Sequence, residues 1–294
     1  MTRLRSPTGS ERYAAEAAVA APRSERGGFL LTLWTDDPDL AARADAAGID
    51  RIGVDLERAG KRQRQAGLDT WISPHSAERL VDLRAAIVHA RLFARVNPLS
   101  AQSGEELERL LELGVQVVML PMFENAEQVA RFIALVDRRA EVVLLLETSA
   151  AVDDIERIVC VPGVREIHVG INDLALSLGM GNRFSVLDCE PIERVSNCVR
   201  AAGLRFGIGG IGRAGDHELP IPSELIYAQY PRLGATAALV SRAYLTCEEG
   251  ENIDLINEVA RSRELLAHWS AASPPELRHA QRVFRAALAQ CKGW

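Results

Sequence analysis

Short runs of apolar residues recur along the chain and alternate with amphipathic stretches. Eight of these runs are apolar enough to predict strands that are buried on both faces. They span residues 29–34, 51–56, 90–96, 115–122, 141–147, 166–171, 205–210 and 237–243. The clearest is the aliphatic run 142–146, which leads directly into Glu147, so the sequence places a carboxylate where a buried strand ends.

The segments between these strands have apolar residues three and four positions apart, and several end at a glycine, as amphipathic helices do. They include residues 38–48, 104–114, 125–139 and 151–163. Buried strands separated by helices predict parallel pairing through right-handed crossovers. Eight such units in roughly 250 residues predict an α/β fold of the (β/α)8 TIM-barrel type. A doubly wound dinucleotide-binding sheet is disfavoured, because no Gly-x-Gly-x-x-Gly motif follows the first strand.

The chain is predicted to have three parts. We interpret residues 1–27 as a flexible N-terminal arm, residues 28–250 as the barrel and residues 251–294 as a C-terminal helical extension. Within the extension, residues 274–290 begin with two prolines and have the pattern of an extra amphipathic helix. Its apolar face needs a partner, which another subunit could provide.

Composition and charge disfavour several classes of protein. Lys and Arg number 34 against 40 Asp and Glu, which gives a formal charge of −6 without a long basic block. Nucleic acid and anionic membrane are therefore not expected as partners, and no apolar run approaches the length that spans a bilayer. The five cysteines are odd in number and form no Cys-x-x-Cys pair, which disfavours a zinc ribbon or a disulfide scaffold and favours a reducing cytoplasm.

Polar residues stand at the carboxyl ends of most predicted strands, where the active sites of such barrels lie. In chain order they are Asp55, Glu57, Arg58, Arg95, Asn97, Glu147, Asn172, Asp173, Arg213, Ser241 and Arg242. Glu147 and Asp173 follow neighbouring strands about 4.8 Å apart, so their carboxylates would repel unless a cation or a proton lay between them. Such a pair, completed by water and substrate oxygens, suits Mg²⁺, and Mn²⁺ or Co²⁺ would also be accommodated. Alternatively, the two residues pair with arginines or cap the following helices.

Arg95 ends an apolar strand, where a guanidinium needs an anion. A carboxylate or phosphate of the substrate is one candidate, and a salt bridge to Glu57 or Asp55 is the other. The glycines of residues 207–212 could let backbone N–H groups approach an anion, or could only permit a tight turn. We expect four further substrate contacts, from Asn97, Gly170, Asn172 and Arg213.

Three segments in chain order resemble the HpcH/HpaI aldolase and citrate lyase family, whose fold resembles that of phosphoenolpyruvate- and pyruvate-utilising barrels. They are residues 94–98, 110–129 and 144–179, and the resemblance extends from about Phe29 to Tyr244. By that resemblance Glu147 and Asp173 look like the two protein ligands of a divalent metal, and Arg95 looks like the arginine that contacts an oxo-acid or enolate oxygen. In such enzymes the metal chelates a pyruvate-like group and stabilises its enolate while a carbon–carbon bond is made or broken.

The chain departs from the family's pattern after the second strand. The aldolase branch has Gly-Glu-His there, with a histidine that assists proton transfer, whereas this chain has Arg58 at the equivalent position. The citrate lyase branch has Asp-Leu-Glu-Asp. Residues 55–76 instead resemble a subgroup with an extended second loop, and we expect His75 or Lys61 of this loop to supply a proton-transfer group or an anion contact. The alternative for His75 is a solvated loop histidine.

These features predict a divalent-metal-dependent lyase or aldolase that acts on a 2-oxo acid, with pyruvate or a related enolate as one fragment. One alternative is an acyl-CoA lyase or condensing enzyme, for which Lys61, Arg62 and Arg64 could form a basic rim. Another is a barrel that binds an oxo acid without catalysis, because Arg58 replaces the histidine. The resemblance of the C-terminal helix to a segment that family members exchange predicts a homo-oligomer, a trimer or a hexamer.

Overall fold

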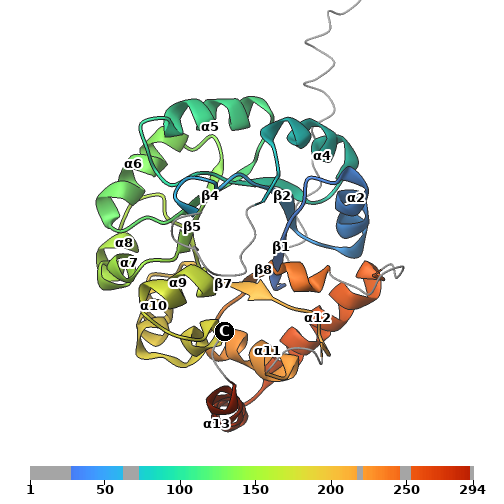
Figure 1. Ribbon diagram of the computed structural model, residues 1–294, viewed down its shortest axis with the longest axis vertical. Helices are drawn as coiled ribbons and strands as arrows, with labels where there is room; N and C mark the ends of the chain where they lie inside the picture. The colour runs from blue at the N-terminus through green and yellow to red at the C-terminus, as the bar shows by residue number, and fades with distance from the viewer. Residues whose placement is uncertain (1–27, 62–72, 217–220, 246–252, 292–294) are drawn as a thin grey trace, which may run out of the picture.

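The protein is a closed barrel of eight parallel strands surrounded by helices (Figure 1). The computed structural model describes residues 28–61, 73–216, 221–245 and 253–291. The strands follow one another around the barrel in chain order, and the eighth pairs with the first. The predicted TIM barrel is therefore confirmed, while the predicted N-terminal arm and the boundary at residue 250 lie outside the described residues.

All eight predicted strands are present, with small differences at their ends. They are β1 (Leu30–Trp34), β2 (Arg51–Asp55), β3 (Arg91–Arg95), β4 (Val117–Pro121), β5 (Glu141–Leu146), β6 (Glu166–Val169), β7 (Arg205–Ile211) and β8 (Ala237–Val240). Nearly all of their residues are buried, because helices cover the outside of the barrel and side chains fill the inside.

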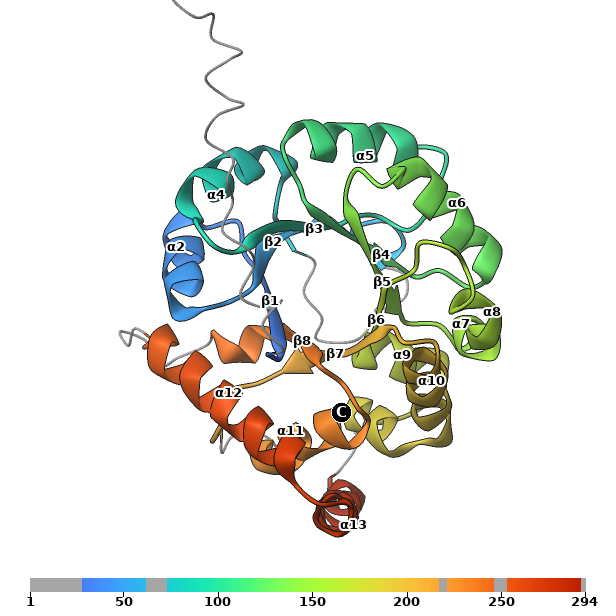
Figure 2. The ribbon, with the colours of Figure 1, turned by 180° about the vertical axis from the view of Figure 1, so that it is seen from behind.

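Helices surround the barrel, and all but the last of them form a ring around it (Figure 1 and Figure 2). They are α2 (Pro38–Ala47), α4 (Leu80–Ala86), α5 (Ser103–Glu112), α6 (Ala126–Val136), α7 (Ser149–Asp153), α8 (Ile155–Ile158), α9 (Ile171–Ser177), α10 (Glu190–Ala201), α11 (Ser223–Arg232), α12 (Leu255–Ala271) and α13 (Pro274–Gln290), with the 3-10 helices η2 (Ala77–Arg79), η3 (Arg183–Asp188) and η4 (Arg242–Tyr244). The single helix expected over 151–163 is two short helices, because Asp154 leaves the helical conformation and accepts a hydrogen bond from the Ala126 N–H. No described helix is both long and apolar enough to cross a membrane.

The C-terminal part of the chain contains two helices with different positions (Figure 2). Helix α12 packs against both α11 and α2, so it closes the ring of helices rather than extending beyond it. Helix α13, which was predicted from the sequence, packs against α11 and η3 at the outer edge of the molecule. Its Arg285 and Gln281 side chains both donate to Asp188, the last residue of η3.

Alternate residues of each strand point into the barrel. Midway along the barrel axis the interior is apolar, and it contains Phe93, Val117, Met119, Val143, Leu145 and Leu239. Two residues further along β3 and β5, the same alternation reaches Arg95 and Glu147. The pattern that builds the apolar interior therefore also carries these two charged side chains to the carboxyl ends of the strands.

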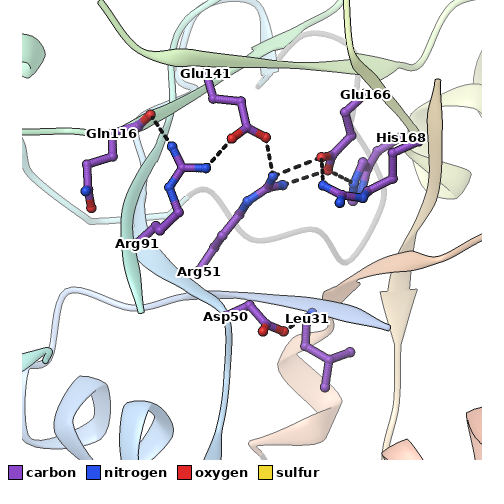
Figure 3. A network of polar contacts seen from close by, with 9 residues as sticks. Leu31, Asp50, Arg51, Arg91, Gln116, Glu141, Glu166 and His168 are labelled. Atoms are coloured by element: carbon purple, nitrogen blue, oxygen red, sulfur yellow. Dashed lines mark hydrogen bonds and ion pairs between the residues drawn. The ribbon is translucent and has the colours of Figure 1, made fainter. Parts of the chain in front are cut away.

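The amino ends of the strands hold a buried network of ionisable side chains (Figure 3). Arg51 donates two hydrogen bonds to Glu166, at 2.6 and 2.9 Å, and one to Glu141 at 2.5 Å. Arg91 also donates to Glu141, and Nε2 of His168 lies 2.6 Å from Oε1 of Glu166. Burial alone would raise the pKa of Glu166, but Arg51 and His168 hold it well below its ordinary value. Arg205 also donates to Glu166, at 3.0 Å, so each charged group of this network has a partner of opposite charge within the protein.

Replacement of Arg51 by Met should lower the free energy of unfolding by about 3–5 kcal/mol, because it leaves Glu166 buried without its main partner. The pKa of Glu166 is lowered in the folded protein, so the stability from its ionisation is present above the ordinary pKa and is lost as the pH falls through and below that value. Urea unfolding near neutral pH and at about pH 4 measures both effects.

The matched control is Arg109→Gln, which removes an exposed ion pair with Glu78. It should change the stability by less than about 1 kcal/mol. If Arg51→Met lowered the free energy of unfolding by no more than Arg109→Gln does, the stabilising role of the buried network would be contradicted.

Candidate active site

A cavity of about 460 Å³ opens at the carboxyl ends of the strands, a volume typical of small-molecule sites. Its wall includes residues that end β1, β2, β3, β5, β6 and β8. Six of its ionisable residues are no more than 9% exposed: Asp55, Lys61, His75, Arg95, Glu147 and Asp173. Buried ionisable groups that converge on one cavity mark a candidate active site.

Arg95 lies among carboxylates. Its Nε and Nη2 donate to the two oxygens of Asp55, at 2.8 and 2.7 Å, which is bidentate pairing. Its Nη1 lies 3.1 Å from Oε2 of Glu57 and 3.7 Å from Oε1 of Glu147, and its guanidinium lies 4.3 Å from the ring centroid of Trp34. Burial opposes ionisation of Asp55, but Arg95 lowers the pKa of that carboxyl to about 2. Salt bridges of Arg95 to both Asp55 and Glu57, one of the two alternatives, are therefore present.

Lys61 is enclosed by the same carboxylates. Its Nζ lies 3.4 Å from Oδ2 of Asp55 and 3.5 Å from Oε2 of Glu57, and the residue is 6% exposed. Lys61 is therefore part of the cavity wall and not of a solvent-exposed basic rim for an acyl-CoA. Arg62 and Arg64, also considered for that rim, lie outside the described residues.

The inner part of the cavity holds more negative than positive formal charge. Its carboxyl groups are those of Asp55, Glu57, Glu147 and Asp173, and its cations are Arg95 and Lys61. Burial, then Glu57 and Asp173, raise the pKa of Glu147 well above its ordinary value, although Arg95 opposes them. Its Oε2 is buried and has no hydrogen-bond partner in the part of the chain that the structure describes. A divalent cation held by Glu147 and Asp173 would balance the charge and satisfy this oxygen.

Glu147 and Asp173 come from neighbouring strands. Glu147 directly follows β5, Asp173 lies in the first turn of α9 after β6, and β5 pairs with β6. The described residues contain no group of three or more His, Cys, Asp or Glu side chains arranged to hold a metal. The residues present fit a site with two protein ligands, in which water and substrate provide the others, as Mg²⁺ accepts.

Gly170 leaves room for the Glu147 side chain. A Cβ atom at Gly170 would lie 2.7 Å from both Cγ and Oε1 of Glu147. The backbone of Gly170 is extended, with φ −86° and ψ 96°, a conformation that other residues adopt. Glycine is therefore required at this position by the close approach of the carboxylate and not by the backbone.

His75 lines the cavity, as expected for the second loop, and Arg58 supports it from outside. Nδ1 of His75 accepts a hydrogen bond from the Asp55 backbone N–H at 3.1 Å, and Nε2 lies 3.7 Å from Oδ1 of Asp36. Arg58 donates to the His75 carbonyl oxygen at 2.6 Å, while its backbone N–H donates to Asn97. Burial lowers the pKa of His75 despite Asp36 and Asp55, which favours the neutral ring. Because Nδ1 accepts, the proton of the neutral ring lies on Nε2.

The four other predicted substrate contacts separate into two pairs. Gly170 and Asn172 line the cavity. Asn97 and Arg213 are not among the described residues that line it. The Asn97 side chain instead accepts from the loop after β2 and donates to Glu106, so it holds two loops together.

Among the residues of the wall that sequence reasoning missed are Trp34 and Arg183. Trp34 ends β1 and packs on Arg95, and its strand-end position was visible in the sequence. Arg183 begins η3, well after the end of β6, and no strand-end pattern points to it.

The model of the HpcH/HpaI aldolase/citrate lyase family matches residues 28–208, more than half of the chain. The chain belongs to this family. A citrate lyase subunit beta-like protein from Deinococcus radiodurans is 33% identical over 144 residues, 48% of this chain and 50% of that protein. A hydroxypyruvate/pyruvate aldolase from Roseovarius nubinhibens is 25% identical over 215 residues, 62% of this chain and 78% of that protein. The chain thus spans about half the length of the first relative.

The fold of the chain is also similar to that of a solved structure from this family. A crystal structure of an HpcH/HpaI aldolase/citrate lyase family protein from Burkholderia cenocepacia superimposes with a TM-score of 0.58 at 22% identity, over 73% of this chain and 88% of that one. The resemblance drawn from the sequence is confirmed. The names of the family and of its relatives are those of lyases and aldolases.

Replacement of Gly170 by Ala should weaken divalent-metal binding by more than about tenfold, because the new methyl group displaces the Glu147 carboxylate. Titration calorimetry with Mn²⁺ measures the change. Gly181→Ala is the control, since a Cβ there would meet nothing within 4 Å. Unchanged metal affinity in a folded Gly170→Ala protein would contradict the placement of Glu147.

Proposed function

We propose that this protein is a divalent-metal-dependent carbon–carbon lyase or aldolase that acts on a 2-oxo acid through a pyruvate-type enolate. One observation carries the proposal: the buried Glu147, beside Arg95, and the buried Asp173 line the inner part of the cavity, where four carboxyl groups meet two cations, and Glu147 has an oxygen without a hydrogen-bond partner among the described residues. Two carboxylate ligands, with the other coordination positions left for water and substrate, suit Mg²⁺, Mn²⁺ or Co²⁺. The family membership supports the reaction class.

A cation held by Glu147 and Asp173 would supply Lewis-acid polarisation of the carboxylate and 2-oxo group of the substrate. Arg95 complements it. Two of the five guanidinium N–H groups donate to Asp55, and Nη1 forms an ion pair with Glu57, so a remaining N–H can donate to a substrate oxygen in the cavity. Because these carboxylates already fix the guanidinium, it needs no reorientation when negative charge develops on the substrate.

His75 suits the role of an anion contact better than that of a general base. Its Nδ1 lone pair is occupied by the Asp55 N–H, so the neutral ring carries its proton at Nε2, which lies 3.7 Å from Oδ1 of Asp36. A neutral imidazole with a lowered pKa can polarise an oxyanion without transferring its proton. We therefore assign to His75 a hydrogen bond to a developing oxyanion, and to Lys61 the balancing of charge on Asp55 and Glu57.

An acyl-CoA lyase is the second candidate, because part of the chain is similar to a citrate lyase subunit beta-like protein. If the protein turned over a CoA thioester and did not turn over free 2-oxo acids, the acyl-CoA lyase would replace the aldolase as its proposed function. A non-catalytic barrel would bind metal and oxo acid yet turn over neither class of substrate.

The metal site predicts coupled binding. Oxalate, an analogue of the pyruvate enolate, should bind with Mg²⁺ or Mn²⁺ present and not without it. In Asp173→Ala and in Glu147→Gln the affinity for oxalate in the presence of the metal should fall by more than about tenfold, because each substitution removes a charged metal ligand. Titration calorimetry measures the affinities, with Asp153→Asn, an exposed aspartate on α7, as the control. Metal-independent oxalate binding, or equal binding in all variants, would refute the site.

The protonation state of His75 is a separate prediction. Nitrogen-15 spectra of the imidazole should show the proton on Nε2 at neutral pH and a pKa below the ordinary value of about 6.5. Turnover should decrease as the pH falls through this lowered pKa, because protonation breaks the bond from the Asp55 N–H.

Removal of the ring tests its catalytic role. His75→Ala should lower kcat by about 10²–10³, the effect of one oxyanion donor, while metal-dependent oxalate binding persists. Normal turnover in His75→Ala would exclude this role, and a proton on Nδ1 would exclude the assigned hydrogen bond.

A further inference from the structure

A line of hydrogen bonds outside the cavity connects α5 to the loop after β2. Oε1 of Glu106 in α5 accepts from the backbone N–H of Asn97 at 3.1 Å and from its Nδ2 at 2.9 Å. Oδ1 of Asn97 accepts in turn from the backbone N–H groups of Arg58 and Ala59, at 2.9 and 3.1 Å. Both ends of the Asn97 amide are thus bonded, which fixes the backbone at Arg58 relative to β3 and α5.

The guanidinium of Arg58 continues this line to His75. Its Nη2 donates to the carbonyl oxygen of His75 at 2.6 Å and lies 3.5 Å from that of Pro74. Hydrogen bonds from a charged donor are shorter and stronger than those between neutral groups. Arg58 follows β2, and His75 precedes η2, 17 residues further along the chain. The bond therefore joins the two ends of this connection and restricts where the backbone of His75 can lie.

The imidazole of His75 depends on that backbone position. Its Nδ1 accepts from the backbone N–H of Asp55 at 3.1 Å, and the residue lines the cavity at 6% exposure. A backbone shift of about 1 Å would lengthen this bond beyond hydrogen-bond range. The ring would then lose the contact that keeps its Nδ1 an acceptor and its proton on Nε2.

We propose that Arg58 and Asn97 are positioning residues that act through His75. Asn97 fixes the backbone at Arg58, and Arg58 fixes the backbone at His75, so that the imidazole keeps one tautomer and one place in the cavity wall. Neither Arg58 nor Asn97 is among the described residues that line the cavity, so their effect on the reaction is indirect. The inference rests on the proposed function, because it takes His75 to contact a developing oxyanion.

Nitrogen-15 spectra of the His75 imidazole test the positioning without a substrate, with the signals assigned by their loss in His75→Ala. In wild type the proton should lie on Nε2. In Arg58→Met and in Asn97→Ala the form protonated on Nδ1 should appear as well, because the bond from the Asp55 N–H is weakened. Arg58→Lys, which keeps a charged donor, should show a smaller change. A single, unchanged tautomer in Arg58→Met and Asn97→Ala would overturn the proposal.

A second measurement tests whether the positioning matters to the chemistry. With Mg²⁺ present, exchange of the methyl protons of pyruvate for deuterium from D₂O reports formation of the enolate. Arg58→Met should slow this exchange by about 10- to 100-fold, as misplacement of an active-site group by about 1 Å does. The double variant Arg58→Met/His75→Ala should be as slow as His75→Ala alone, within about twofold, because Arg58 acts through His75. If the two effects multiplied instead, the proposal would fail.

Two controls accompany the variants. Arg131→Met removes an exposed arginine on α6 and should leave the spectrum and the exchange rate at their wild-type values. Metal-dependent binding of oxalate should be the same in wild type and in Arg58→Met, which would show that the variant folds and that the site at Glu147 and Asp173 is intact. If Arg58→Met does not fold, Arg58→Lys and Asn97→Ala provide both measurements.

The outcomes separate this proposal from the proposed function. Absence of pyruvate exchange in wild type would overturn the pyruvate-type enolate, while the spectra would still decide how His75 is positioned. Pyruvate exchange that is present in wild type and equally fast in Arg58→Met and Asn97→Ala would overturn the positioning role and leave the proposed function in place.

Discussion

Charge matching inside a closed barrel is the constraint on which this structure depends. Water is largely excluded from the interior, so an ionised side chain there needs an opposite charge. At the amino ends of the strands, Arg51 and Arg91 meet Glu141 and Glu166 within the protein. At the carboxyl ends, Arg95 and Lys61 face a larger number of carboxylates. The ionised groups at the amino ends therefore have their partners within the protein, whereas the inner part of the cavity at the carboxyl ends has four carboxyl groups and two cations.

Close packing inside the barrel explains two glycines that each face a large polar side chain from the neighbouring strand. A Cβ at Gly207 would lie 2.4 Å from Nε2 of His168, just as one at Gly170 would meet Glu147. Each glycine removes a side chain at the level where a neighbouring strand projects a large polar group into the barrel. Small and large residues thus share a fixed interior volume, and the polar groups of both ends are held by packing as well as by charge.

Much of the fold was predictable from the sequence, because buried parallel strands consist of apolar runs that need no tertiary information to recognise. Glu147 and Arg95 each stand at the end of one of these apolar runs, so their positions at the carboxyl ends of the strands were also predictable. The pairing of Arg95 with Asp55 and Glu57 was one of two open alternatives, because spacing along the chain does not fix side-chain geometry. The enclosure of Lys61, the hydrogen bond of His75 and the place of Arg183 depend on loops, whose course is set by tertiary contacts that no periodicity records.

Helix α13 is connected to the cavity through one short element. Its Arg285 and Gln281 hold Asp188 at the end of η3, and Arg183 at the start of η3 lines the cavity. A protein shortened before Pro274, for easier expression or crystallisation, would lose both of these anchors at once. Glu147 and Asp173 would be untouched, yet the part of the cavity wall that contains Arg183 would be held by fewer contacts. The C-terminal helix is therefore a poor place for a tag, a truncation or a fusion joint in any study of substrate selectivity.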